Sequence, residues 1–194
     1  MMLLWDNMKN LKFLYDRNQL NLSEFKKIFL ELNNEIENMN LAILNEYQDD
    51  RSSLNLLKDY ESLEKIKNII KEKLKTKPKY LILIGIGGSN LGTIAVQEAI
   101  FGKLYNQKNP KIKFLNADTV DSDFINDIVE IIEPVLKNGK NIIINLISKS
   151  GGTTETISNF EILENTLKKY KGNPEEYIVA ITDKHSKLDR KSVV

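Results

Sequence analysis

Three short, mainly apolar runs in the second part of the chain constrain its fold more than any other feature. They occupy residues 80–84, 141–147 and 177–181, and residues 111–115 are a further strand candidate between the first two. Apolar runs of this length, without regular polar alternation, are typical of strands that are buried on both faces of a parallel sheet. The sequence therefore predicts four parallel strands.

The segments between these runs have helical patterns. Residues 89–101, 121–132 and 153–170 carry apolar side chains mostly three or four positions apart. Alternation of strands and helices implies right-handed crossovers, with helices on both faces of the sheet and the loops after the strands at one edge. Ligands bind at that edge in folds of this class. We expect an α/β domain over residues 77–194, with a parallel sheet flanked by helices.

Residues 1–76 have a different pattern and are predicted to form a helical N-terminal segment. Ser23 is the expected N-cap of a first helix. The apolar residues of that helix are Phe25, Ile28, Phe29, Leu32, Ile36 and Met39. A second helix is predicted over residues 54–74, and Pro78 follows it as a stop signal.

The composition excludes several functions. Lys and Arg number 28 against 27 Asp and Glu, so the chain lacks the basic excess of a non-specific nucleic-acid binder. With no Cys and one His, disulfides, thiolate chemistry and His-rich metal sites are not expected. The chain begins without a signal-peptide pattern, and its longest apolar run, residues 80–86, is too short to span a membrane. We expect a cytoplasmic protein that uses no metal or cofactor and binds neither nucleic acid nor membrane.

A glycine-rich loop, residues 85–92, lies between the first predicted strand and its helix and reads GIGGSNLG. Glycine allows positive φ and close approach of a ligand to the main chain, and the helix N-terminus adds free N–H groups. The spacing is not that of a dinucleotide fingerprint, because Asn90 stands where the third glycine would be. A ligand loop and a simple connecting turn both remain open at this stage.

A second loop, residues 148–156, reads SKSGGTTET and precedes another predicted helix. Its first seven residues hold four hydroxyl groups, one Lys and two Gly, which suit a phosphate at a helix N-terminus. The P-loop pattern is absent, so a phosphomonoester is a better candidate ligand than a nucleoside triphosphate. The alternative is a plain helix cap, with Thr153 capping and Glu155 as a first-turn charge.

Together, in this order and at this separation, the two loops closely resemble the signature loops of glucose-6-phosphate isomerases. The resemblance covers residues 54–183, including Ala180-Ile181-Thr182-Asp183 as the end of a following strand. It implies a sugar-isomerase (SIS) domain, which is flavodoxin-like, and a hexose phosphate as ligand. The resembled enzymes act as homodimers without a cofactor.

The resemblance also assigns roles to particular residues. Ser148, Ser150 and Thr153 match hydroxyl ligands of the sugar phosphate, and Lys149 matches a position that contributes its main chain. Gly88 and Ser89 match positions that line the sugar end of the site. There is one departure, because Gly152 stands where the family usually has Thr. A hydroxyl is therefore missing from the loop.

The resembled isomerisation also needs a general base, a cation beside the enediolate and a ring-opening acid. In the family these are a Glu, an Arg, a His and a Lys, all downstream of the matched region. His185 does not match the catalytic His, and Glu155 is a first-turn charge rather than the base. We therefore expect a chain that is truncated before the second SIS domain, contains the phosphate-binding half of an isomerase and is inactive alone. Catalytic residues are unknown within it.

Two other functional hypotheses remain open from the sequence. A stand-alone SIS domain would bind a phosphosugar as a regulatory module without catalysis. A nucleotide-binding α/β protein is disfavoured by the absent P-loop and the failed glycine spacing. The helical N-terminal segment and the residue pattern of the second loop favour the isomerase hypothesis.

Overall fold

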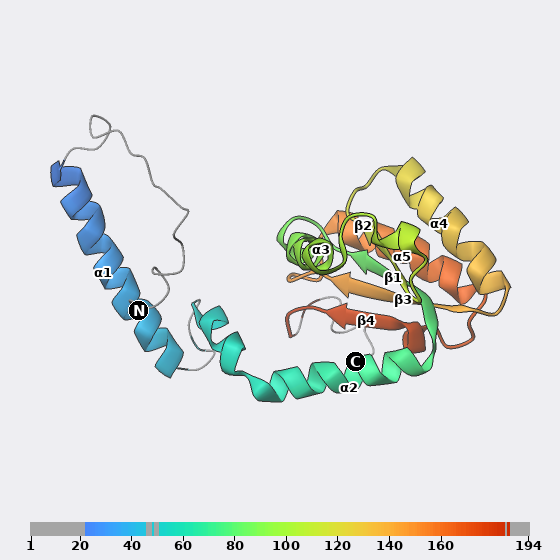
Figure 1. The fold of residues 1–194 in the computed structure, drawn as a ribbon, viewed down its shortest axis with the longest axis horizontal. Helices are drawn as coiled ribbons and strands as arrows, with labels where there is room; N and C mark the ends of the chain where they lie inside the picture. Colours follow the sequence, from blue (N-terminus) through green and yellow to red (C-terminus); the bar gives the residue numbers. More distant parts are fainter. Residues whose placement is uncertain (1–21, 46–47, 49–50, 185, 187–194) are drawn as a thin grey trace. The chain divides into compact units, whose positions relative to one another are not determined.

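The computed structural model describes residues 22–45, 48, 51–184 and 186 of the 194-residue chain. The chain divides into two compact units, residues up to Glu64 and residues from Lys65 onward. Figure 1 shows the course of the chain and the labels of its helices and strands. The domain boundary expected from the sequence, between residues 76 and 77, remains a prediction.

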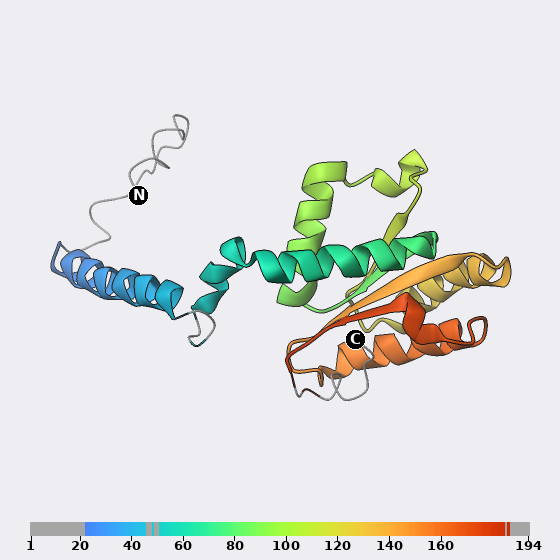
Figure 2. The ribbon, with the colours of Figure 1, turned by 90° about the horizontal axis from the view of Figure 1, so that it is seen from below.

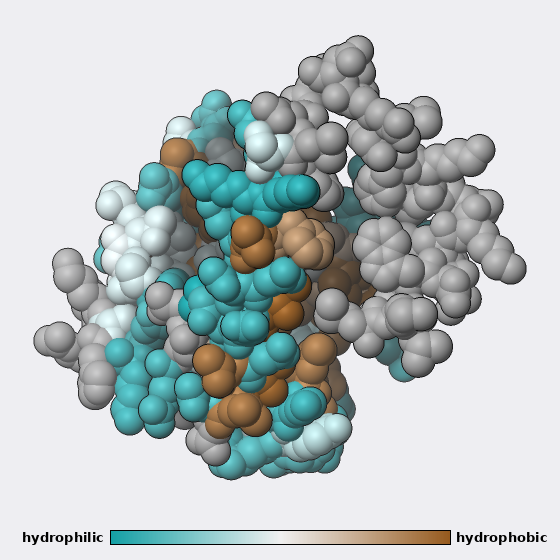
Figure 3. All heavy atoms as spheres, turned by 90° about the vertical axis from the view of Figure 1, so that its left-hand side faces the viewer, coloured by the Kyte–Doolittle hydropathy of each residue, from teal (hydrophilic) through white to brown (hydrophobic). Residues whose placement is uncertain are grey.

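The first unit contains helix α1, Leu22–Leu44, and the 3₁₀-helix η2, Ser52–Lys58. Ser23 lies inside α1 rather than before it, so the expected N-cap is wrong. Arg51 and Glu35 form a bidentate ion pair, with a distance of 2.9 Å from Nη2 to Oε2. Figure 3 shows one face of the molecule, on which brown hydrophobic residues lie between teal hydrophilic ones. Phe29 and Leu32 of α1 are exposed.

The second predicted helix, residues 54–74, is in fact two elements. The 3₁₀-helix η2 ends at Lys58, and helix α2 covers Tyr60–Lys75. Asp59 separates them, because its carboxylate accepts a hydrogen bond from the Ser62 amide at 2.9 Å. A side chain that caps the first turn of a helix fixes the start of that helix. The apolar spacing continued across Asp59 and concealed the break.

Replacing Asp59 by alanine is expected to lower the free energy of unfolding by about 1 kcal/mol, because the Ser62 amide loses its acceptor. Urea denaturation of the 194-residue chain measures this change. Asp59→Asn keeps an acceptor oxygen and is the matched control, which should stay close to the wild type. Equal losses in both variants would show that the carboxylate does not act as a cap.

The second unit is built on the predicted parallel sheet. Its strands are β1 (Pro78–Ile84), β2 (Lys113–Ala117), β3 (Asn141–Ile147) and β4 (Ile178–Ile181). All neighbours are parallel, and the strand order is β2-β1-β3-β4. Strand β3 has the bounds that the sequence predicts, and the expected α/β class is confirmed.

Strand β2 lies two residues further along the chain than the predicted range of 111–115. It pairs with β1 from Tyr80↔Lys113 to Ile84↔Ala117. The Asn106 side chain pairs with the outer edge of this strand, since its Nδ2 donates to the Phe114 carbonyl and its Oδ1 accepts from the Phe114 amide at 2.9 Å. A side chain that occupies an edge in this way reduces pairing with other strands. The polar Asn116 hid the true end of β2 in the sequence.

Helices cover the sheet on both faces, as Figure 2 shows. Helix α3 (Gly88–Phe101) lies on one side, and α4 (Ser122–Lys137) and α5 (Thr154–Lys168) lie on the other. The helix predicted over residues 121–132 is α4, and Asp121 is its N-cap, since the Asp121 carboxylate accepts hydrogen bonds from the amides of Asp123 and Phe124.

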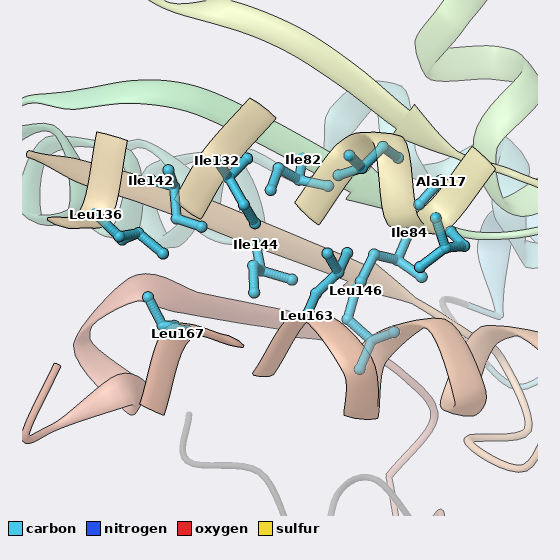
Figure 4. Packing of buried hydrophobic residues seen from close by; sticks show 12 residues of the cluster. Ile82, Ile84, Ala117, Ile132, Leu136, Ile142, Ile144, Leu146, Leu163 and Leu167 are labelled. Carbon is cyan, nitrogen blue, oxygen red and sulfur yellow. The ribbon is translucent and has the colours of Figure 1, made fainter. Parts of the chain in front are cut away.

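The hydrophobic core lies between the strands and α4 and α5. Figure 4 shows isoleucine and leucine side chains from the strands and from both helices meeting in one layer. Its fully buried members include Ile82, Ile84, Ile132, Ile142, Ile144, Leu146, Leu163 and Leu167. Because side chains alternate along a strand, Leu81, Ile143 and Val179 point to the opposite face. This core packs the strands firmly against α4 and α5, and the strands in turn position the loops that follow their carboxyl ends.

The C-terminal half of α2 is attached to this unit by Lys73. The Lys73 ammonium donates to the carbonyl oxygens of Glu175 and Glu176 at 3.1 and 2.9 Å. These residues belong to the 3₁₀-helix η4, Pro174–Tyr177, which leads into β4. Burial lowers the pKa of Lys73 from its ordinary value, against the opposing effects of Glu176 and Glu72.

Candidate functional site

The two loops singled out by the sequence follow neighbouring strands. Strands β1 and β3 pair in register up to Ile84↔Leu146, so residues 85–87 and 148–153 leave the sheet side by side. From β1 the chain crosses to β2 through α3, whereas from β3 it crosses the other way to β4 through α5. Such a reversal of direction opens a crevice outside the carboxyl ends of the two strands, where α/β proteins of this type bind ligands.

Gly85 lies where the two loops approach most closely. A Cβ at this position would lie 3.1 Å from the Ser89 Cβ and 3.3 Å from the Ile147 carbonyl oxygen. Only a residue without a side chain fits between the first loop and the end of β3. This close approach holds Ser89 of the first loop near Ile147, the residue that precedes the second loop.

The second loop gathers three hydroxyl groups around Thr153. The Thr153 Oγ1 lies 3.3 Å from the Ser148 Oγ and 3.5 Å from the Ser150 Oγ. Ser148 is buried, with 1% of its surface exposed, whereas Ser150 is exposed. The Ser150 Oγ also accepts a hydrogen bond from the Gly152 amide at 3.2 Å. Ser148, Ser150 and Thr153, predicted from the sequence as phosphate ligands, are therefore brought together; we call them the hydroxyl cluster.

Thr153 occupies the N-cap position of α5, but its hydroxyl makes no capping hydrogen bond. The first helical hydrogen bond runs from the Ile157 amide to the Thr153 carbonyl at 3.0 Å. The amides of Thr154, Glu155 and Thr156 have no acceptor within the helix, which leaves a partial positive charge beside the hydroxyl cluster. The plain-cap alternative for Thr153 is thus not what the structure shows. Glu155 lies in the first turn of α5, as expected.

Lys149 is exposed, and its carbonyl oxygen faces the segment after β4. It accepts a hydrogen bond from the Asp183 amide at 3.1 Å. The sequence predicts a main-chain role for Lys149 at the phosphate. The structure shows that the carbonyl is engaged elsewhere, which leaves the adjoining amide groups as the main-chain donors of this loop.

The first loop is held in a conformation that requires glycine. Gly87 precedes α3 with φ +58° and ψ −121°, and no side chain caps this helix. The Ser89 amide donates to the Ile86 carbonyl at 3.2 Å. Gly88 is exposed and Ser89 is half-buried. Both predicted sugar-side residues therefore lie at the start of α3, beside the crevice.

Three asparagines, the buried Asn90 and Asn159 and the half-buried Asn145, were not predicted as functional. The Asn90 and Asn145 side-chain oxygens are buried without a hydrogen-bond partner in the structure. Asn159 of α5 is 2% exposed, and its Nδ2 donates to the Thr119 carbonyl in the loop after β2 at 2.8 Å. An asparagine inside an otherwise apolar helical or strand pattern is the sequence signal that would have drawn attention to them.

A groove of about 540 Å³ lies on the face of the sheet that does not pack against α4 and α5, and it is a poor site for a phosphate. It is lined mainly by apolar residues, among them Ile66, Ile70, Leu81, Ile143 and Val179. Its cationic side chains are Lys73, which hydrogen bonds to η4, and the exposed Lys111. The hydroxyl cluster and the α5 N-terminus are absent from its lining.

The described part of the chain contains no group of three or more His, Cys, Asp or Glu side chains placed to hold a metal ion. None of its helices is both long and apolar enough to cross a membrane. His185, the single histidine, lies outside the described residues.

Strand order, helix placement and paired loops define the class of this unit as a flavodoxin-like α/β domain whose strand order reverses between β1 and β3. The family described as phosphoglucose isomerase matches residues 55–192. The chain belongs to the phosphoglucose isomerase family.

Curated relatives agree with this assignment. The chain is 33% identical to glucose-6-phosphate isomerase of Carboxydothermus hydrogenoformans over 128 residues, 63% of this chain and 26% of that enzyme. It is 40% identical to glucose-6-phosphate isomerase of Mycoplasmopsis synoviae over 136 residues, 68% of this chain and 30% of that enzyme. The chain thus spans between a quarter and a third of these relatives.

Two solved structures share the fold. One is the hypothetical protein TT0462 from Thermus thermophilus, with a TM-score of 0.58, 24% identity and coverage of 88% of this chain and 39% of that one. The other is a glucose-6-phosphate isomerase from Chlamydia trachomatis, with a TM-score of 0.56, 23% identity and coverage of 74% of this chain and 26% of that one.

Proposed function

We propose that this chain provides the sugar-phosphate-binding portion of a glucose-6-phosphate isomerase. The reaction interconverts glucose 6-phosphate and fructose 6-phosphate by proton transfer between C1 and C2 through an enediolate. The hydroxyl cluster at the uncapped N-terminus of α5 carries this proposal. Three hydroxyl donors beside free helix amides match the oxygens of a phosphomonoester.

In this proposal Ser148, Ser150 and Thr153 donate hydrogen bonds to the phosphate oxygens, together with main-chain amides that follow Lys149. Gly88 and Ser89 line the sugar end of the site. The close approach at Gly85 keeps these two residues next to the loop that holds the phosphate. The loops orient the hexose phosphate but hold no general base. We propose that the base, the cation and the ring-opening groups belong to the part of the family's sequence that this chain does not match.

The wider setting follows from the same family membership. We propose that the enzyme acts in the cytoplasm in glycolysis and gluconeogenesis, works as a homodimer and needs no cofactor. A second candidate, a phosphosugar-binding module without catalysis, is favoured by one observation: the two loops present hydroxyls, amides and glycines but no positioned acid–base pair.

Calorimetric titration of the 194-residue chain tests the proposal. Glucose 6-phosphate and inorganic phosphate should bind, whereas glucose should not, because the hydroxyl cluster contacts the phosphate. A coupled assay should detect no isomerisation by the chain alone. Equal binding of glucose and glucose 6-phosphate would contradict the phosphate site. Normal turnover would contradict the assignment of the catalytic groups to other parts of the family's sequence.

Gly152 offers a direct way to strengthen the site. A Cβ at this position meets only the Ser150 carbonyl oxygen at 4.0 Å, so the backbone accepts a side chain without a clash. Gly152→Thr is expected to tighten phosphate binding by up to about tenfold, by adding a hydroxyl and by stiffening the loop. Calorimetry with inorganic phosphate measures the change.

Gly152→Val is the matched control, since valine has the shape of threonine without the hydroxyl. Valine should give only the part of the gain that comes from the stiffer backbone. If valine and threonine tighten binding equally, the added hydroxyl does not reach the phosphate.

A further inference from the structure

The segment that follows β4 is hydrogen bonded to the loop that carries the hydroxyl cluster. The Ser148 amide donates to the Ile181 carbonyl at 3.0 Å, and the Asp183 amide donates to the Lys149 carbonyl at 3.1 Å. The Thr182 hydroxyl lies 3.4 Å from the same Lys149 carbonyl. Two donors from the segment after β4 thus converge on one carbonyl of the loop.

These bonds form a bulge immediately after the last residues of β3 and β4. The last regular pair is Ile147↔Ile181. In a regular parallel ladder the residue opposite Thr182 would both donate to Ile181 and accept from Asp183. Here Ser148 makes the first bond and Lys149 makes the second, so two loop residues lie opposite one. Bulges of this kind redirect the chain next to functional sites.

The bulge fixes the peptide group between Lys149 and Ser150. In a trans peptide the carbonyl and the following N–H point in opposite directions. Because the Lys149 carbonyl points to the segment after β4, the Ser150 amide points away from it. That amide has no hydrogen-bond acceptor among the described residues. A free donor is therefore held in a set direction on the residue whose hydroxyl belongs to the cluster.

The segment after β4 is itself well braced. The Ser186 amide donates to the Asp183 carbonyl at 3.1 Å, and the hydroxyls of Thr182 and Ser186 are 2.8 Å apart. The Thr182 hydroxyl has one proton, which it shares between the Ser186 Oγ at 2.8 Å and the Lys149 carbonyl at 3.4 Å, so the Asp183 amide is the stronger donor to that carbonyl.

We propose that Thr182 and Asp183 are positioning residues of the phosphate site. They hold the Lys149 carbonyl, and through the planar peptide they present the Ser150 amide to the phosphate. This inference rests on the proposed function, because it requires a phosphate at the hydroxyl cluster. It adds two residues from the segment after β4, neither of which touches the ligand.

The test is an NMR titration of the 194-residue chain with inorganic phosphate, followed at the Ser150 amide. Thr182→Val removes the hydroxyl and keeps the branched shape, so phosphate should bind about threefold to tenfold more weakly. Thr182→Ser should restore wild-type binding. Asp183→Pro removes the stronger donor and should weaken binding more. In both weakened variants the shift of the Ser150 amide on binding should shrink.

Thr166→Val is the matched control, because the Thr166 hydroxyl donates to the Ile162 carbonyl at 3.0 Å within α5. It should leave phosphate binding unchanged. If the wild type binds phosphate and Thr182→Val keeps both its affinity and its Ser150 shift, the positioning role is overturned. If the wild type binds no phosphate, the proposed function fails and the inference fails with it. Thermal unfolding separates a weakened site from an unfolded variant.

Discussion

Replacing Ser148 and Thr153 together by alanine is expected to weaken binding of glucose 6-phosphate more than about 100-fold, because each hydroxyl lost from a charged ligand removes about 1.5–3 kcal/mol. The two hydroxyls are 3.3 Å apart, so a single phosphate can contact both. Both side chains shrink without a change of backbone, and the fold should persist. Calorimetry with glucose 6-phosphate measures the loss.

Ser158→Ala is the matched control for this pair. Ser158 is exposed on the same helix but lies one turn beyond its N-terminus, away from the cluster. Its removal should leave binding unchanged. If the double variant binds glucose 6-phosphate as tightly as Ser158→Ala does, the hydroxyl cluster is only a local feature of the loop.

Gly87→Ala is expected to destabilise the α/β unit by about 1–3 kcal/mol, since alanine would have to adopt a strained backbone conformation. Gly87 has φ +58° and ψ −121°, a combination that residues with a Cβ avoid. Relief of the strain would shift the start of α3, and with it Gly88 and Ser89. Binding of glucose 6-phosphate should therefore weaken in the same variant.

Hydrogen exchange of the β1 and β3 amides measures this change within the α/β unit. Gly92→Ala is the control, because Gly92 lies inside α3 and a Cβ there meets no atom within 4 Å. Alanine at this helical position should be neutral or stabilising by up to about 1 kcal/mol. Equal destabilisation by both substitutions would show that the conformation of Gly87 is not the cause.

The sequence predicted the parts of the fold that depend on local patterns. A mainly apolar run located β3 to the residue, and the apolar spacing after Asp121 located the start of α4 to within one residue. The predicted bounds were wrong where one polar side chain sets the end of an element through a hydrogen bond that the apolar pattern does not reveal. Asp59 interrupts an apolar spacing by capping α2, and Asn106, eight residues before Phe114, pairs with the edge of β2.

The candidate site was predicted in its composition but not in its geometry. Residue types at the second loop indicated three hydroxyls, and the structure brings Ser148, Ser150 and Thr153 together. The sequence left open whether Thr153 caps α5, because capping and ligand binding use the same residue types. The contact of Lys149 with Asp183 could not be predicted, since it depends on the strand order and on the register of β3 against β4.

An amide chemical-shift map of the chain titrated with glucose 6-phosphate tests most directly whether the second loop holds the phosphate. We expect the largest shifts at the amides of residues 150–156, smaller shifts at residues 87–90, and none around the apolar groove lined by Ile66 and Val179. Shifts confined to the start of α3 would place the anion at the first loop instead. Shifts that leave residues 150–156 unmoved would contradict the proposed phosphate site.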